Sequence, residues 1–156
     1  MAGVQRYSGV AIALHWLVVL LVVVQFLSMW LGDLFDRQDP ARDVLFDIHI
    51  VSGIAVLLAI LVRLWWRRGH KPPPPPAGTG RLMRIAAAAV HHGLYVLLVL
   101  QPLLGLGALY VWRGFGEVHE VLANVILVFV GVHVAATLWH QFVLRDGLIR
   151  RMLPAG

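Results

Sequence analysis

The feature of this sequence that most constrains its fold is a run of 24 residues, Gly9 to Gly32, without Asp, Glu, Lys or Arg. A helix of about 20 residues crosses the hydrocarbon core of a bilayer, so this run is long enough to span it. Three further apolar stretches lie at about residues 48–66, 85–112 and 119–144. The pattern predicts an all-α integral membrane protein, a four-transmembrane-helix bundle that forms a single domain over residues 1–156.

The composition agrees with a membrane location. Hydrophobic residues make up 60% of the chain and charged residues 13%, about half the charged fraction of an ordinary soluble domain. A small globule has too little interior for so many apolar side chains, whereas lipid accepts them on the outside of a bundle. The formal net charge of +5 does not indicate a nucleic-acid partner, because the basic residues stand between apolar runs. Membrane lipid is the expected environment.

The charged residues between the spans predict the orientation. Ten of the 13 basic residues lie before the first span, at the end of the second, in the second loop or after the fourth span. The other three, Arg37, Arg42 and Arg113, share the first and third loops with seven acidic residues. Cytoplasmic loops of membrane proteins are enriched in Lys and Arg. Both termini are therefore expected in the cytoplasm, with the first and third loops outside.

Histidine is the residue type that points to a function. The chain has no cysteine, which excludes disulfides, thiolate metal sites and covalent haem attachment. It has eight histidines, and all except His70 fall inside or at the edge of a predicted span. An ionisable residue in a membrane helix is costly and indicates a partner or cofactor. His91, His92 and His140 lie near the inner interface, where an ordinary interfacial role explains them equally well.

Depth in the membrane limits which histidines can meet. At about 1.5 Å of rise per residue, His49 and His119 lie at similar depths toward the outer side. His15 lies toward the inner side, where His133 and His140 are rival partners. His119 and His133 are 14 residues apart, which places them on one face of the fourth span. Two imidazoles on opposite sides of a flat macrocycle are typical of six-coordinate b-type haem. The histidines therefore predict two noncovalent haems at two depths.

Two further groups would suit a bound haem, although each has an ordinary structural role. Glycines in spans two to four would let a flat ring approach the backbone, but small residues also serve helix packing. Arginines at span ends could pair with haem propionates, but those on the inner side also fix the orientation. The glycines are Gly53, Gly105, Gly107 and Gly131, and the arginines are Arg63, Arg84 and Arg113.

Several motifs resemble a known family. They are RYSGVAIALHWLVVLLVV around His15, IHIVSGI around His49, HHGLYVLLVLQPLLGL in the third span, and VHEVLANVILVFVGVHVAATLWHQF, followed by LIRRMLP. Together they resemble the bacterial cytochrome b-561 family, most closely its small superoxide:ubiquinone oxidoreductase (superoxide oxidase) members. The resemblance implies a diheme cytochrome b domain in the bacterial inner membrane. It also implies that His15 with His133, and His49 with His119, are the axial ligands of two haems b.

The resemblance implies oxidation of superoxide to oxygen on the periplasmic side and reduction of ubiquinone. Arg113, with Arg37 and Arg42, is the only source of positive charge for an anion on the outer side, and no catalytic residue is otherwise identified. Candidates for a quinone pocket are His91, Tyr95 and His140, at the inner ends of spans three and four.

Three alternatives stay open. The first is an electron-transfer cytochrome b subunit that links a dehydrogenase, a hydrogenase or another redox partner to the quinone pool. The second is a histidine-lined metal transporter, although transporters of zinc or nickel usually place carboxylates at mid-membrane, and every acidic residue here lies at or outside a span end. The third is a structural membrane protein without a cofactor.

Overall fold

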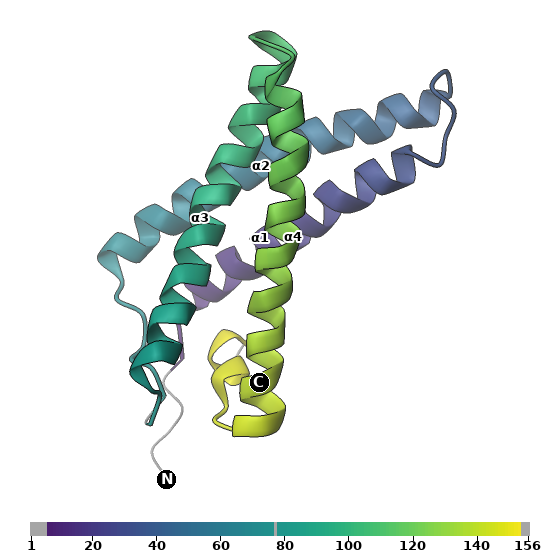
Figure 1. Cartoon of the computed structure of the whole chain (residues 1–156). Coiled ribbons are helices and arrows are strands. Elements are labelled where there is room, and N and C mark those ends of the chain that lie inside the picture. Colours follow the sequence, from purple (N-terminus) through teal and green to yellow (C-terminus); the bar gives the residue numbers. More distant parts are fainter. Residues whose placement is uncertain (1–5, 77, 154–156) are drawn as a thin grey trace.

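The computed structural model describes residues 6–76 and 78–153, and these form helices and connecting segments with no strand (Figure 1). Each of the four long helices, with the last counted through Leu144, is long and apolar enough to cross a membrane. The predicted all-α, four-span architecture is confirmed. The helices are α1 Gly9–Gly32, α2 Pro40–Gly69, α3 Arg81–Tyr110 and α4 Phe115–Trp139, followed by a π-helical segment η1 His140–Leu144 and a 3₁₀ segment η2 Leu148–Met152.

Three helices begin earlier than the apolar runs that predicted them. The start of α2 is Pro40 instead of residue 48, that of α3 is Arg81 instead of residue 85, and that of α4 is Phe115 instead of residue 119. Hydropathy marks only the apolar part of a helix, and in each case the helix also includes the more polar residues that precede this part. At α2, Asp39 accepts a hydrogen bond from the backbone N–H of Ala41 at 2.9 Å, and Pro40 suits the first turn.

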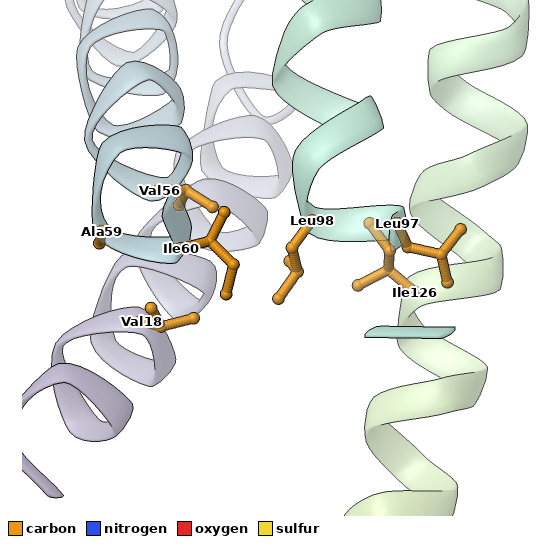
Figure 2. Close-up of a cluster of buried hydrophobic side chains, with 7 residues drawn as sticks. All are labelled: Val18, Val56, Ala59, Ile60, Leu97, Leu98 and Ile126. Carbon is orange, nitrogen blue, oxygen red and sulfur yellow. The ribbon is translucent and has the colours of Figure 1, made fainter. Parts of the chain in front are cut away.

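The helices are arranged as two hairpins that cross each other. Figure 1 shows α1 beside α2 and α3 beside α4, and α2 contacts α3 where the hairpins meet. The buried core lies at this crossing (Figure 2), and it consists of Val18, Val56, Ala59, Ile60, Leu97, Leu98 and Ile126. Many other apolar side chains face outward; Leu20, for example, is 61% exposed. A bundle with a small core and an apolar exterior is suited to a lipid environment.

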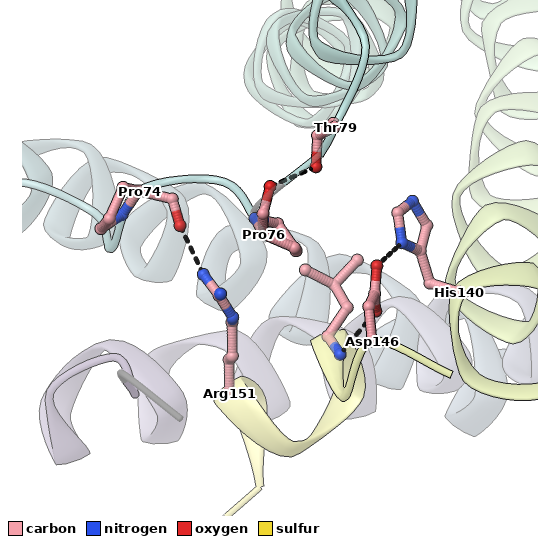
Figure 3. Close-up of polar contacts among 7 residues, drawn as sticks. Pro74, Pro76, Thr79, His140, Asp146 and Arg151 are labelled. Carbon is pink, nitrogen blue, oxygen red and sulfur yellow. Dashed lines mark hydrogen bonds and ion pairs between the residues drawn. The ribbon is translucent and has the colours of Figure 1, made fainter. Parts of the chain in front are cut away.

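Both described chain ends lie at one end of the bundle, which we call the terminal end. The backbone N–H of Tyr7 donates to the carbonyl of Arg151 at 3.2 Å, and Nε1 of Trp16 donates to the carbonyl of Met152 at 2.8 Å. Arg151 also donates to the carbonyl of Pro74 in the proline-rich connector at 2.5 Å (Figure 3). The opposite end carries the turns at residues 33–39 and 111–114, and we call it the turn end.

Candidate functional site

Two pairs of histidine rings bridge the hairpins, one toward each end of the bundle. Toward the turn end, His49 of α2 and His119 of α4 have ring centroids 6.0 Å apart and ring planes at 80°. Toward the terminal end, His15 of α1 and His133 of α4 have ring centroids 6.3 Å apart and ring planes at 71°. The fold thus brings together the same two pairs that the family resemblance implied.

The spacing of each pair suits one metal ion between two imidazoles. An imidazole nitrogen binds a transition metal at about 2.0–2.1 Å, with the ring centre about 1 Å further away. Two imidazoles on opposite sides of one ion therefore have ring centres about 6 Å apart. Within residues 6–76 and 78–153, no group of three or more His, Asp or Glu side chains is placed to hold a metal ion. Two imidazoles alone fit a metal that arrives with its other ligands, as iron does in haem.

Hydrogen bonds at the turn-end pair use Nδ1 of each histidine ring and leave Nε2 available. Nδ1 of His49 lies 3.2 Å from the backbone carbonyl oxygen of Gln25, and Nδ1 of His119 lies 2.9 Å from that of Gln101. A carbonyl oxygen only accepts hydrogen bonds, so Nδ1 carries the proton in both rings. Nε2 is then unprotonated and able to bind a metal, the usual arrangement of a ligating histidine.

His91 lies beside the terminal-end pair. Its ring centroid is 5.0 Å from that of His133, with the planes at 88°. This separation is shorter than the roughly 6 Å between two ligands on opposite sides of one ion. Nδ1 of His91 donates to the carbonyl of Ala87, one turn earlier in α3, at 2.6 Å. The ring of His91 is therefore close to the pair but not placed as a partner of His133 across a metal.

A polar cluster formed by side chains of α2 and α3 lies next to His91. Arg63 of α2 donates from Nε to the hydroxyl oxygen of Tyr95 at 3.2 Å, and from Nη1 to the carbonyl of Ala11 at 3.0 Å. The guanidinium of Arg67 lies over the ring of Tyr95, 5.7 Å from its centroid. Tyr95 is four residues after His91, so the two share one face of α3. Two of the three predicted quinone-pocket residues therefore lie together.

The third residue, His140, is buried in a different arrangement. It is the first residue of η1, and its Nδ1 lies 2.5 Å from Oδ2 of Asp146 (Figure 3). The other carboxylate oxygen of Asp146 accepts from the backbone N–H of Leu148 at 3.0 Å. The chain reverses between these residues, where Arg145 has a φ of 53° and Gly147 a φ of 71°. His140 therefore interacts with the C-terminal segment, and His15 pairs with His133.

The relatives of this chain agree with a haem-binding bundle. The sequence profile of the prokaryotic cytochrome b561 family matches residues 6–155. The chain belongs to the prokaryotic cytochrome b561 family. It is 30% identical to a probable superoxide oxidase, CybB, of Yersinia pestis, over 96% of this chain and 97% of that protein. It is 33% identical to cytochrome b562 of Cereibacter sphaeroides, over 94% of each. It is 26% identical to cytochrome b561 homolog 1 of Escherichia coli, over 96% and 97%.

Membership in the cytochrome b561 family, together with four membrane-spanning helices, makes this protein a multi-pass membrane electron-transfer cytochrome. The family implies b-type haem, and the probable superoxide oxidase among the relatives supports an oxidoreductase role. The interpretation as a histidine-lined metal transporter receives no support from these relatives.

The basic residues at the turn end of this cytochrome differ in their surroundings. Arg113 is exposed in the turn between α3 and α4, and its backbone carbonyl accepts from the N–H of Gly116 at 2.9 Å. Arg42 lies in α2 and forms an ion pair with Asp33 at 3.6 Å, which offsets its charge. Arg37 is exposed in the first turn.

The glycines that were expected to admit a haem ring mostly face protein side chains. A Cβ atom at Gly53 would meet the side chain of Gln25 at 3.4 Å, one at Gly107 would meet the ring of Phe115 at 3.0 Å, and one at Gly105 would meet the ring of His119 at 3.0 Å. Packing therefore explains these three. Only at Gly131, among the four, does a Cβ find no neighbour within 4 Å.

Three polar residues of the site were missed by the sequence analysis: Gln25, Gln101 and Asp146. The two glutamines are uncharged polar residues inside otherwise apolar runs, and this signal could have singled them out. Asp146 lies outside the predicted spans, where an acidic residue is ordinary, so its contact with His140 had no signal in the sequence.

Proposed function

We propose that this cytochrome is a diheme electron-transfer protein of the bacterial inner membrane that oxidises superoxide at its turn end and reduces ubiquinone toward its terminal end. The observation that supports it best is the presence of two histidine pairs at two depths, each spaced for one iron. His119 and His133 are 14 residues apart in α4, so the two levels are separated by about 21 Å along that helix.

Each pair would hold one haem b between its two Nε2 atoms. When bound, haem would supply a one-electron carrier. The side chains would bind the substrates and move the protons. Two superoxide anions would each give up one electron and leave as oxygen. One ubiquinone would gain two electrons and two protons. The proposed orientation has both termini in the cytoplasm, so the turn end faces the periplasm.

The polar cluster near the terminal-end pair would receive the quinone. The hydroxyl oxygen of Tyr95 accepts from Arg63, so its own O–H is free to donate to a quinone oxygen. The imidazole of His91 uses Nδ1 on Ala87 and presents Nε2 to the surroundings. His140 and Asp146 form a second hydrogen-bonded pair at the same end and would pass protons from the cytoplasm.

Arg113 would attract superoxide at the turn end. It is an exposed cation in the α3–α4 turn, the connection closest in sequence to His119. Because the same end carries seven acidic residues, attraction of an anion has to be local, within about one Debye length of 8–10 Å.

That acidic surplus also favours a second function, electron transfer from a positively charged redox partner or a dehydrogenase to the quinone pool. Negative residues at the turn end would steer a basic protein there. Exposed apolar residues lie beside them; Tyr110 and Val111 are 79% and 78% exposed.

The experiment that separates the two is stopped-flow mixing of the purified protein with superoxide and a soluble ubiquinone analogue. The proposal expects fast haem reduction that superoxide dismutase abolishes, with quinol formed at half the molar amount of superoxide consumed. Haem reduction no faster than the uncatalysed background would reject superoxide as the donor, and the partner-linked function would then be preferred.

A further inference from the structure

The two histidines of the turn-end pair are held by the same pattern of hydrogen bonds, once in each hairpin. In the first hairpin, Nε2 of Gln25 donates to the backbone carbonyl of His49 at 2.6 Å, while Nδ1 of His49 donates to the carbonyl of Gln25 at 3.2 Å. In the second, Nε2 of Gln101 donates to the carbonyl of His119 at 2.9 Å, while Nδ1 of His119 donates to the carbonyl of Gln101 at 2.9 Å. We call each reciprocal contact a glutamine clamp.

A clamp of this kind restrains a histidine more than one hydrogen bond would. A single bond at Nδ1 leaves the backbone of the histidine free to shift along its neighbour. The second bond, from the glutamine amide to the backbone carbonyl, ties the two helices at the same level. A carbonyl oxygen has two lone pairs, so it accepts the amide in addition to its helical N–H partner. The two bonds together fix where Nε2 points.

A glycine lies next to each glutamine clamp and leaves room for its side chains. Gly53, one turn after His49, faces Gln25, and a Cβ atom there would lie 3.4 Å from Oε1. The amide of Gln25 also donates to Oγ of Ser52 at 2.5 Å. In the second hairpin, Gly105, one turn after Gln101, faces the ring of His119. A glycine therefore leaves the space that the clamp needs in both hairpins.

The terminal-end pair lacks this device. Among residues 6–76 and 78–153, neither His15 nor His133 has a hydrogen bond at Nδ1. The carbonyl of His133 does accept an additional bond, at 2.8 Å, but from Thr137 of its own helix. Both histidines of the turn-end pair thus have a hydrogen-bonding contact from a neighbouring helix, and in the described residues neither histidine of the terminal-end pair has one.

We propose that Gln25 and Gln101 are positioning residues that hold the two axial ligands of the turn-end haem in one orientation and thereby set its reduction potential. This rests on the proposed function, because it needs haem between His49 and His119. The Nδ1–H···O=C bond makes Nε2 a stronger donor to iron. A stronger donor favours the ferric state. The ring planes at 80° predict a highly anisotropic low-spin ferric EPR signal, since perpendicular imidazoles leave the iron orbitals nearly degenerate.

The test uses the full-length holoprotein and the variants Gln25→Met and Gln101→Met, which keep the side-chain size and remove the amide. The backbone carbonyl that accepts from Nδ1 of the histidine remains in both variants. What each variant loses is the amide bond that keeps this carbonyl and the imidazole aligned. Gln38→Met is the matched control, because Gln38 is exposed in the turn between α1 and α2. Optical redox titration and EPR are the readouts. We expect the ferric preference of one haem to fall about tenfold in both variants, a rise of about 59 mV for a one-electron couple. The anisotropic signal should become more rhombic, and the second haem should stay unchanged.

The same haem must respond to both substitutions, although the glutamines lie on different hairpins. Wild-type potentials and EPR signals in both variants would overturn the inference, and so would a response of different haems. If a methionine variant loses both haems, the corresponding asparagine variant decides. It keeps the amide but is one methylene too short to reach the carbonyl, so it must show the one-haem shift. Wild-type protein that binds no haem would instead refute the proposed function.

Discussion

His15 of α1 and His133 of α4 come from different hairpins, yet their ring centroids lie 6.3 Å apart. That separation is about what two imidazoles need on opposite sides of one iron. Since the two residues meet only when the hairpins cross, haem bound between them would link the halves of the bundle. Assembly of the fold and cofactor binding are then coupled.

Alanine substitution of one histidine should remove one haem site and leave the other intact. His133→Ala should lower the haem content from two to one per chain and leave the turn-end haem, and His119→Ala should do the reverse. His140→Ala is the control, because its ring contacts Asp146 and should leave both haems bound. Pyridine haemochrome measures the total haem content, and the α-band of the reduced native protein, at about 560 nm, shows which haem remains. Loss of a haem in His140→Ala with retention in His133→Ala would reverse the pairing.

Gly105→Ala should weaken the turn-end haem site. The added methyl would lie 3.0 Å from Cε1 and 3.2 Å from Nδ1 of His119, so the ring has to move. Overpacking typically costs about 1–3 kcal/mol, or roughly a 5–150-fold loss of affinity. The transfer rate of haem to apomyoglobin reports this change.

Gly32→Ala, at the end of α1, is the control for that substitution, because a Cβ atom there would meet only Cβ of Leu45 at 3.9 Å, an ordinary van der Waals contact. Both variants gain about the same 0.5–1 kcal/mol of helix stability from alanine. The difference between them isolates the contact with His119. Equal haem transfer rates would show that the ring of His119 has room to move without loss of binding.

Tyr95→Phe tests the quinone site. It removes the hydroxyl that accepts from Arg63 and that would donate to the quinone. We expect both haems to remain, the reduction of haem by superoxide to be unchanged, and the turnover of a quinone analogue to fall at least about tenfold. Tyr110→Phe, at an exposed position of the turn end, should retain wild-type turnover. Unchanged turnover in Tyr95→Phe would place quinone reduction elsewhere.

Arg113→Gln tests the attraction of superoxide. Loss of this exposed charge should slow haem reduction by superoxide by roughly threefold to tenfold at low ionic strength, with a smaller effect at high salt. Arg42→Gln should change the rate less, because Asp33 already offsets the charge of Arg42 at 3.6 Å. The rates are measured by stopped-flow at several salt concentrations. A larger effect of Arg42 than of Arg113 would move the anion path to the first turn.

The choice between His133 and His140 shows where sequence reasoning stops. Depth and angle assume a continuous α-helix, and on that assumption both residues could approach His15. The chain instead changes to a π-helix at His140 and reverses at Arg145 and Gly147. A π-helix has more residues per turn, so side chains after the change point in new directions. His140 consequently faces Asp146, a contact that hydropathy does not encode.

The glutamine clamps are a second feature that sequence reasoning could predict only in part. Gln25 and Gln101 are visible in the sequence as polar residues in apolar runs, and a polar group in a membrane requires a partner. The identity of that partner depends on how the two helices of a hairpin are rotated against each other. That rotation is set by packing across the whole interface, so only the folded structure pairs Gln25 with His49 and Gln101 with His119.

The sequence by itself determined that this chain forms four membrane helices and carries histidines at two depths, because span length, loop charge and helical rise are local properties. The tertiary structure showed by geometry which rings meet, a pairing that the sequence implied only through family resemblance. It alone decided which histidine turns toward the C-terminal segment and which glycines serve packing. Those outcomes depend on the crossing of two hairpins and on one helix end. They bring together residues more than a hundred positions apart, such as His15 and His133.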